Sequence, residues 1–545
     1  MGYHPGLEDD GVYLTAIKSD LNPALYPHAA DFFRVQLQAT LFDKVIASFI
    51  RLTHLPVAIT ELLFQFISIF LIVLACWCIA RLLFDDQRAQ WAGVALTASM
   101  LTLPVAGTAL YLADQHLHPR TIATALVLLA CSRILAGRRW QAVPLLLIAF
   151  VLHPIMAAFG ISFCFFLTIA LLEPVYIWLR SLRGSLAAAV PLGWIFESPT
   201  PAWHRALETR GYYFLYRWTW YEWLGALAPL FFFWLLWRHA HKQANTPLAR
   251  FALAVVAYGI FQQAVAMIVL ASPSLVRLTP MQPMRFLHLV YFFLTLVAGC
   301  LLGKHLLKGI PWRWAAFLVL INGGMFAAQC AEFSSSPHLE LPWVHSRNPW
   351  LQSFAWIRKN TPIDAYFAMD PHYLAAPGED YHSFRALAER SQLADLEKDP
   401  SVVTQVPELG PAWQKQVDAT IGWKLFNIKD FERLKRDFGV DWVIVPYPQP
   451  QGLNCKWHQQ DIAVCEIPSN PLTTFVPERR NMSEAPLRGS APGMTCEIFA
   501  VNLGCLDPAA LPTDDLASLC LHVAEIDITE VGPRRFSERS PEQEI

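Results

Sequence analysis

The sequence predicts an α-helical polytopic membrane protein, with about eight or nine transmembrane helices, that ends in a soluble α/β domain. Of its 545 residues, 54% are hydrophobic and only 16% are charged, whereas soluble domains carry about 25% charged residues. Apolar stretches near the roughly 20 residues that a spanning helix needs recur between residues 62 and 330. This composition excludes an ordinary soluble enzyme, a disordered chain and a nucleic-acid-binding protein.

Changes in composition divide the chain into four predicted parts. Residues 1–58 are mixed and polar and form an N-terminal segment with an acidic loop. Residues 59–330 hold the membrane helices. Residues 331–466, where helical and strand-like patterns alternate, form the α/β domain. Residues 467–545 are rich in Pro, Ser and acidic side chains and are expected to be a poorly ordered acidic tail.

Short basic loops predict the orientation, because Lys and Arg are enriched on the cytoplasmic side of membrane proteins. The three loops contain Arg133, Arg138 and Arg139; Arg238, Lys242 and Arg250; and Lys304, Lys308 and Arg313. Alternation then places the N-terminal segment and the α/β domain outside. It also requires residues 140–172 to cross an odd number of times, either as one helix broken at His153-Pro154 or with a re-entrant segment near 186–197.

The predicted outside position of the N-terminal segment leads to a further expectation. A first transmembrane helix is expected upstream of Met1, since some helix must carry this segment across the membrane. The alternative is translocation led by the apolar stretch 62–80. In the α/β domain, Cys455 and Cys465 flank a short segment and are able to pair if this domain lies in an oxidising compartment.

Local signals predict the elements of the α/β domain. Asn348 is a candidate N-cap, with Pro349 at the first position of a helix that runs to Lys359. Turn and cap signals elsewhere give four more elements. These are helices over 384–397 and 431–438, the second ended by Gly439, and strands over 365–369 and 440–445.

Three consecutive carboxylates, Glu8, Asp9 and Asp10, are the most informative feature of the N-terminal segment. They lie in a charge-poor half of the chain, on a predicted outside loop before a membrane helix. Asp9 and Asp10 are candidate ligands of a divalent cation, Mg²⁺ or Mn²⁺, and a carboxylate of this triplet is a candidate base for an acceptor hydroxyl. The alternative is a solvated acidic turn near the terminus.

A second polar cluster lies on the same predicted side, between two spans, in the sequence Asp114-Gln115-His116-Leu117-His118-Pro119-Arg120-Thr121. Arginine and histidine suit a phosphate, and an aspartate can orient a histidine or bind a metal. Asp114, His116, His118 and Arg120 are therefore candidate substrate-binding residues. The alternative is an interfacial loop among lipid headgroups.

Three further ionisable residues are candidates for substrate binding. His153 lies in an apolar run, where ionisable groups are costly and commonly face a cavity; the alternative is a hydrogen bond to a carbonyl freed at the proline kink. Arg277 and Arg285 precede a span that contains His288. Their guanidinium groups suit a diphosphate or a lipid-linked phosphate, and membrane anchoring is the alternative.

Two other groups are expected to be structural. Aromatic residues between 203 and 223, together with Arg205, Arg210 and Arg217, predict an amphipathic interfacial segment, with isoprenoid binding as the alternative. Arg385 and Arg390 are expected to form salt bridges on a helix face, with a substrate at the membrane surface as the alternative.

Together these features resemble the GT-C superfamily of polytopic membrane glycosyltransferases. The resemblance rests on Glu8-Asp9-Asp10, the Asp114–Thr121 loop, Arg285 and the trailing α/β domain. The acidic motif departs from the family pattern, since it is a run of three acids and not two acids separated by one residue. More narrowly, the chain is similar to bacterial multi-pass membrane proteins that share a His-Pro-Arg-Thr loop and a trailing pattern. Here that pattern is Trp356, Asn360-Thr361-Pro362, Phe384-Arg385 and Arg390-Ser391.

The resemblance implies sugar transfer from a polyprenyl-phosphate donor to an envelope acceptor on the periplasmic side. Asp9 or Asp10 would be the general base or a metal ligand. The donor phosphate would be held by His116, His118, Arg120, Arg277 or Arg285. Two other functions remain open: a non-catalytic envelope protein whose outside domain binds a partner, and a transporter or flippase, which predicts repeat symmetry and charges at mid-depth. The sequence does not indicate an oligomeric state.

Overall fold

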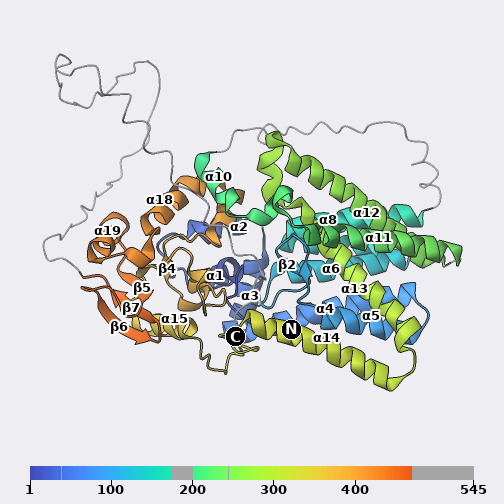
Figure 1. The fold of residues 1–545 in the computed structure, drawn as a ribbon, viewed down its shortest axis with the longest axis horizontal. Helices are drawn as coiled ribbons and strands as arrows, with labels where there is room; N and C mark the ends of the chain where they lie inside the picture. The colour runs from blue at the N-terminus through green and yellow to red at the C-terminus, as the bar shows by residue number, and fades with distance from the viewer. Residues whose placement is uncertain (39, 173–199, 244, 469–545) are drawn as a thin grey trace, which may run out of the picture. The chain divides into compact units, whose positions relative to one another are not determined.

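Helices make up most of the structure, a computed structural model that describes residues 1–468 except 39, 173–199 and 244 (Figure 1). Met1–Pro468 form one compact unit. The predicted re-entrant segment near 186–197 lies outside the described residues, as does the predicted tail from residue 469 onward.

Five of the described helical stretches are long and apolar enough to cross a membrane. They are α4 (Val57–Leu83), α8 (Pro154–Leu171), α12 (Thr246–Ala271), α13 (Leu287–Leu302) with its flanking turns, and α14 (Pro311–Glu332). The stretch around α13 is mostly buried, whereas α14 exposes Val319, Leu320 and Phe326. Large apolar side chains exposed along a whole helix suit lipid and not water. The protein is therefore a multi-pass membrane protein, and the number of eight or nine crossings stays a prediction.

Further helices pack with these spans. They are α5 (Gln87–Ser99), α6 (Pro119–Leu135), α7 (Arg139–Leu152) and α11 (Trp220–Lys242). The predicted break at His153-Pro154 is confirmed, because α7 ends at Leu152 and α8 begins at Pro154. His153 caps α8 by accepting the Met156 N–H at Nδ1, 3.3 Å away.

Helices α5 and α13 approach each other through glycines. A Cβ on Gly299 would lie 2.7 Å from the main-chain oxygen of Ala92, and one on Gly93 would lie 2.4 Å from Cys300 Sγ. Small residues commonly allow such close contact between membrane helices. This contact and the burial of the stretch place α13, which directly follows the turn that carries Arg285, inside the helical part.

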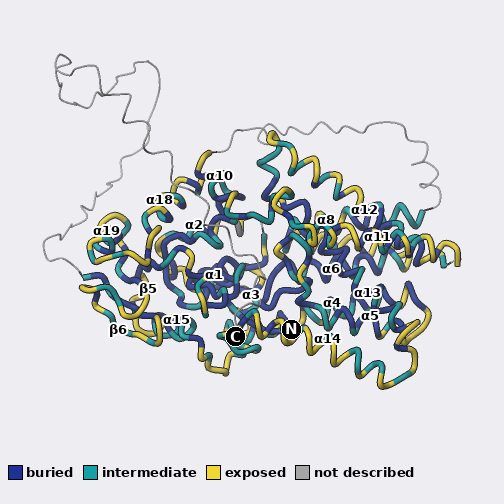
Figure 2. The backbone as a smooth tube through the Cα atoms, in the orientation of Figure 1, coloured by how far each residue is buried: buried dark blue, intermediate teal, exposed yellow. Residues whose placement is uncertain are grey.

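The N-terminal segment forms α1 (Asp10–Leu21), α2 (Asp31–Leu37) and α3 (Phe42–Thr53) and packs against the α/β domain. Tyr3 pairs with Leu339 and Leu7 with His382 as isolated β-bridges. Every residue of α1 from Asp10 to Ser19 is buried (Figure 2). The alternative of a solvated acidic turn is therefore wrong for Asp10.

The α/β domain contains a five-stranded sheet in the order β4-β3-β5-β7-β6. The strands are β3 (Tyr366–Ala368), β4 (Ser391–Gln392), β5 (Trp442–Pro446), β6 (Asn454–Gln459) and β7 (Ile462–Glu466). β3 is parallel to β4 and β5, and β7 is antiparallel to β5 and β6. Alternate residues of a strand face opposite sides, so Phe367 and Ile444 pack with α15 (Pro349–Asn360), while Val443 packs with α19 (Ile428–Phe438).

Several local predictions for this domain are confirmed. The Asn348 side chain accepts the N–H groups of Trp350 and Leu351 and caps α15. Gly439, with φ +77°, ends α19. A disulfide joins Cys455 to Cys465 across the paired strands β6 and β7.

The predicted helix over 384–397 is wrong beyond its first turn. α16 (Phe384–Ala388) ends because Glu389 adopts a left-handed conformation with φ 54°. The Arg390 guanidinium then donates to the main-chain oxygens of Thr361 and Arg358, which brings the following residues into the sheet as β4. Arg390 is thus held by carbonyls and not by helix-face acids.

Arg385 forms an ion pair, as predicted, but a buried one between separate elements. Its two terminal nitrogens donate to the two carboxylate oxygens of Asp399 at 2.6 and 2.7 Å. Asp399 is the first residue of α17 (Asp399–Gln405). The pair fixes the loop that precedes α17, and this loop carries Lys398.

Candidate functional site

The acidic triplet lies at the start of α1, where a tight turn fixes its side chains. Gly6 has φ +82°, and a Cβ there would lie 2.7 Å from the Leu387 side chain. Its N–H donates to Asp10 Oδ2 at 2.7 Å. Asp9 is the N-cap residue of α1, and its side chain is 31% exposed. The two neighbouring aspartates therefore have separate surroundings.

Asp114 organises the predicted polar loop. It accepts hydrogen bonds from Arg120 Nε at 3.1 Å, from Arg120 Nη2, and from Thr121 Oγ1 at 2.9 Å. Its main-chain oxygen accepts from Gln65 Nε2 at 2.7 Å. A bidentate arginine–carboxylate pair with further hydrogen bonds is the geometry that offsets the cost of burying both charges. The loop thus presents Arg120 in a fixed orientation.

His118 joins the polar loop to the acidic triplet. It caps α6, and its Nδ1 accepts the Arg120 N–H at 2.9 Å. In a neutral imidazole the nitrogen that accepts carries no proton, so the proton is on Nε2. That atom lies 3.5 Å from Asp9 Oδ2. His118 therefore presents an N–H toward the partly exposed carboxylate.

Two cations flank the same carboxylate. Arg120 Nη1 is 3.8 Å from Asp9 Oδ2, and Lys398 Nζ is 3.4 Å from Asp9 Oδ1. Lys398 also donates to Glu8 Oε2 at 3.1 Å. It is the N-cap residue of α17, so the α/β domain contributes a side chain to the same cluster as the N-terminal segment.

Tyr13 links Arg285 to this cluster. Its ring packs edge-on against His118, with centroids 4.8 Å apart. Burial raises the pKa of the Tyr13 phenol, Asp9 raises it further, and Arg120 and Arg285 oppose both. Arg285 and Asp9 are therefore within electrostatic range of the same hydroxyl.

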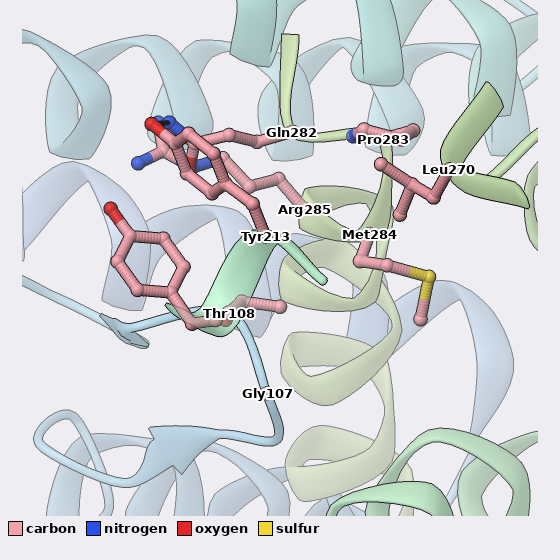
Figure 3. A pocket seen from close by; sticks show the side chains of 9 residues that line it. Gly107, Thr108, Tyr213, Leu270, Gln282, Pro283, Met284 and Arg285 are labelled. Carbon is pink, nitrogen blue, oxygen red and sulfur yellow. Dashed lines mark hydrogen bonds between the residues drawn. The ribbon is translucent and has the colours of Figure 1, made fainter. Parts of the chain in front are cut away.

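Arg285 lines a small, open hollow (Figure 3), whose empty space of about 230 Å³ includes open solvent. The other lining residues include Thr108, Tyr212, Tyr213 and Gln282. Gln282 Nε2 donates to the Tyr213 hydroxyl at 2.8 Å. The Nε atom of Arg285 is buried without a hydrogen-bond partner among the described residues. Such a group gains most from a charged acceptor such as a phosphate oxygen.

The surroundings shift the pKa values of the two aspartates in opposite directions. Burial favours a raised pKa for Asp9. The pKa is nevertheless held well below its usual range by Lys398, the His118 N–H and Arg120. Burial raises the pKa of Asp10, and the neighbouring Asp9 adds to the rise. Asp9 is thus the ionised carboxylate that reaches the surface of the cluster.

The low pKa of His118 predicts a loss of stability in acid. Burial lowers this pKa from 6.5 to about 4, so between these values the unfolded chain binds the proton more tightly and the native state loses stability as pH falls. Between pH 7 and 5 the loss from this residue is about 2 kcal/mol.

The measurement is thermal unfolding in detergent at both pH values for wild type and His118→Asn. Asparagine keeps a capping acceptor but does not titrate, so we expect the variant to lose less stability on acidification. An equal loss in both proteins would contradict the low pKa.

The remaining predicted residues lie at different distances from this cluster. The His153 ring centroid is 6.0 Å from that of His118. His116 is buried, and neither ring nitrogen has a partner among the described residues. Arg277 lies over the Trp203 ring, 5.9 Å from its centroid. Trp203 itself is fully buried, so it belongs to the protein interior and not to an interfacial belt.

Asp9 and Asp10 remain predicted ligands of Mg²⁺ or Mn²⁺. One oxygen of Asp9 already faces Lys398, and one oxygen of Asp10 accepts the Gly6 N–H. Within the described residues, the His, Cys, Asp and Glu side chains that lie close enough to share an ion are His4, Glu340 and His382. A possible site for a divalent cation is therefore present, formed by residues that the sequence did not single out.

Sequence reasoning also missed Tyr13 and Lys398 as site residues. Tyr13 is four positions after Asp9, which places both on one helix face, so a signal existed. Lys398 carries no local signal, because only the tertiary fold brings it to Glu8 and Asp9.

Comparisons with known proteins find similarity only among solved structures. No protein-family model matches the sequence, and no curated protein matches it. Among solved structures, the apo form of an oligosaccharyltransferase from Archaeoglobus fulgidus is 12% identical with a TM-score of 0.39, over 82% of this chain and 66% of that chain. Its complex with Zn and sulfate is 12% identical with a TM-score of 0.34, over 81% and 64%. The chain thus spans just under two thirds of the length of these structures.

Proposed function

We propose that the protein is a membrane glycosyltransferase that moves a sugar from a polyprenyl-phosphate-linked donor to an envelope acceptor on the periplasmic face of the bacterial inner membrane. One observation carries the proposal. An ionised, partly exposed carboxylate, Asp9, lies between a neutral imidazole N–H and the cations of Arg120 and Lys398 in a multi-pass membrane protein. Arg285 lies within electrostatic range of Asp9.

Each charge has a role in this reaction. The acceptor hydroxyl donates a hydrogen bond to Asp9, and its oxygen attacks the anomeric carbon of the donor sugar. The bond from that carbon to the phosphate oxygen breaks, and its electron pair stays on the phosphate. Arg285 and Lys398 stabilise the negative charge on the departing phosphate, which is where prepositioned cations lower the barrier most.

The lowered pKa of Asp9 decides when the proton moves. A weakly basic carboxylate takes the hydroxyl proton late, after the new carbon–oxygen bond has formed and the hydroxyl has become acidic. Until then Asp9 orients the acceptor and stabilises positive charge on the sugar, as carboxylates do in glycoside chemistry. His118 holds Asp9 in position through its Nε2–H. No step in this scheme passes through a metal ion.

Donor binding tests the proposal. The full chain in detergent is titrated with a polyprenyl phosphate, and wild type is compared with Arg285→Ala. We expect the affinity to fall about 10- to 100-fold, because hydrogen bonds to a charged phosphate contribute about 1.5–3 kcal/mol.

The matched control is Arg205→Ala. Arg205 is partly exposed and paired with Asp418, so we expect its replacement to leave the affinity unchanged. Equal affinity in wild type and Arg285→Ala, with thermal unfolding unaltered, would refute a donor site at Arg285. No binding by wild type would refute the transferase.

A further inference from the structure

A second cluster of titratable side chains joins three separate parts of the chain. His4 Nδ1, in the N-terminal segment, lies 2.8 Å from Glu340 Oε1, in the stretch that follows α14. His382 Nε2, in the α/β domain, lies 3.0 Å from both oxygens of the same carboxylate. All three ligand atoms are within 4.8 Å of one another, and both imidazoles are fully buried.

The hydrogen bonds of His382 place two acceptor atoms opposite each other, which is stable only with a cation between them. Its Nδ1 faces the main-chain oxygen of Glu379 at 2.9 Å. A carbonyl oxygen only accepts, so Nδ1 carries the proton and a neutral His382 directs the lone pair of Nε2 at Glu340. Two acceptors 3.0 Å apart repel each other unless a proton or a metal ion lies between them.

His4, on the other side of Glu340, also has a ring nitrogen whose hydrogen bonding is not satisfied. If its Nδ1 donates to Glu340, its Nε2 is a buried acceptor without a partner among the described residues. The Gln115 side chain is also unpartnered there. A Cβ on Gly2 would lie 2.6 Å from His4 Nε2 and 2.7 Å from Gln115 Oε1, so both atoms border one small space. With a metal on Nδ1, the His4 proton would be on Nε2, which borders the same space as Gln115 Oε1.

The surroundings of His382 match those of a metal-ligating histidine. Such a histidine commonly donates its second ring N–H to a carbonyl or carboxylate, which fixes the tautomer and the ring orientation. The Glu379 carbonyl serves His382 in this way. Phe333 stacks on the His4 ring, with centroids 4.3 Å apart.

We propose that His4, Glu340 and His382 bind one divalent ion of the zinc class. Two imidazoles and one carboxylate are a donor set that suits zinc better than Mg²⁺ or Ca²⁺, which prefer oxygen ligands. Ligand atoms around a tetrahedral ion at about 2.0–2.2 Å are about 3.4 Å apart. The two imidazole nitrogens lie 2.8 and 3.0 Å from Glu340 Oε1, so small shifts of the rings away from this oxygen make room for the ion. The ion ties the turn that carries the acidic triplet to the α/β domain, and its role is structural.

The amount of zinc bound per chain tests this proposal directly. The full chain is purified in detergent, loaded with Zn²⁺, desalted and analysed for zinc per chain. We expect one tightly bound zinc in wild type, and at least a tenfold loss of affinity in His382→Ala and in Glu340→Gln. We expect removal of the ion by a chelator to lower the unfolding temperature of wild type.

Two control variants test whether the zinc binds at His4, Glu340 and His382 and not elsewhere. His372→Ala removes a partly exposed histidine paired with Glu397, and Asp9→Asn alters the proposed transfer site; both are expected to keep the zinc. No zinc in wild type, or zinc lost in Asp9→Asn and kept in His382→Ala, would overturn the proposal. If the ligand variants do not fold, X-ray absorption on zinc-loaded wild type decides: imidazole ligands support the site, and oxygen ligands alone refute it.

Discussion

Replacing Asp9 by asparagine is expected to lower the rate of sugar transfer about 10²- to 10³-fold, the range found when one prepositioned electrostatic group is removed from an active site. The reason is that Asp9 is ionised and partly exposed, whereas Asp10 is buried and bonded to the Gly6 N–H. The affinity for the donor phosphate should not fall, since the substitution removes a negative charge near it. The measurement is the rate of sugar transfer under saturating donor, with donor affinity determined separately.

The matched control for this prediction is Asp31→Asn. Asp31 is an exposed acid at the start of α2 in the same segment, and its replacement should leave the rate unchanged. If Asp9→Asn retains the wild-type rate, Asp9 does not orient the acceptor. If donor affinity falls together with the rate, the carboxylate acts in donor binding and not in the transfer step.

Replacing Arg120 by methionine is expected to destabilise the protein by about 3–5 kcal/mol, the cost of leaving one partner of a buried ion pair unpaired. The Asp114 carboxylate would lose two hydrogen bonds in an interior position. The measurement is the thermal unfolding of wild type, Arg120→Met, Asp114→Asn and the double variant in one detergent. The double variant should recover part of the loss, because it contains no unpaired charge.

A surface pair provides the comparison for Arg120. Arg358 lies 3.6 Å from Glu389, and its side chain is 43% exposed. Arg358→Met should therefore cost less than about 1 kcal/mol. A loss in Arg120→Met as small as that in Arg358→Met would show that Asp114 is solvated, and the low pKa of Asp114 that Arg120 causes would then not hold.

The α/β domain was predictable where the signals are local. Asn348 before Pro349 and Gly439 after a helical run act within one turn of the backbone, so their roles can be read from the sequence. The break at His153-Pro154 has the same origin. In contrast, residues 389–397 have a helical pattern but leave the helix, because Arg390 bonds to carbonyls far back in the chain. No local signal reports such contacts.

The candidate site also contains some residues that the sequence indicates and others that only the tertiary fold brings there. Asp9, His118 and Arg120 are polar residues in apolar surroundings, which makes them visible in the sequence, and the fold brings them within 4 Å of each other. Lys398 and His382 are ordinary residues of a soluble domain until the N-terminal segment packs on that domain. Their roles depend on pairings between positions hundreds of residues apart, which a single sequence does not encode in any local pattern.

The most direct test of the central claim is a cryo-EM structure of the full chain with a bound polyprenyl phosphate. We expect phosphate density in contact with the Arg285 guanidinium, with Asp9 free to meet an acceptor hydroxyl. Density for the phosphate at any other position, with Arg285 left in its present surroundings, would contradict the proposed transfer site.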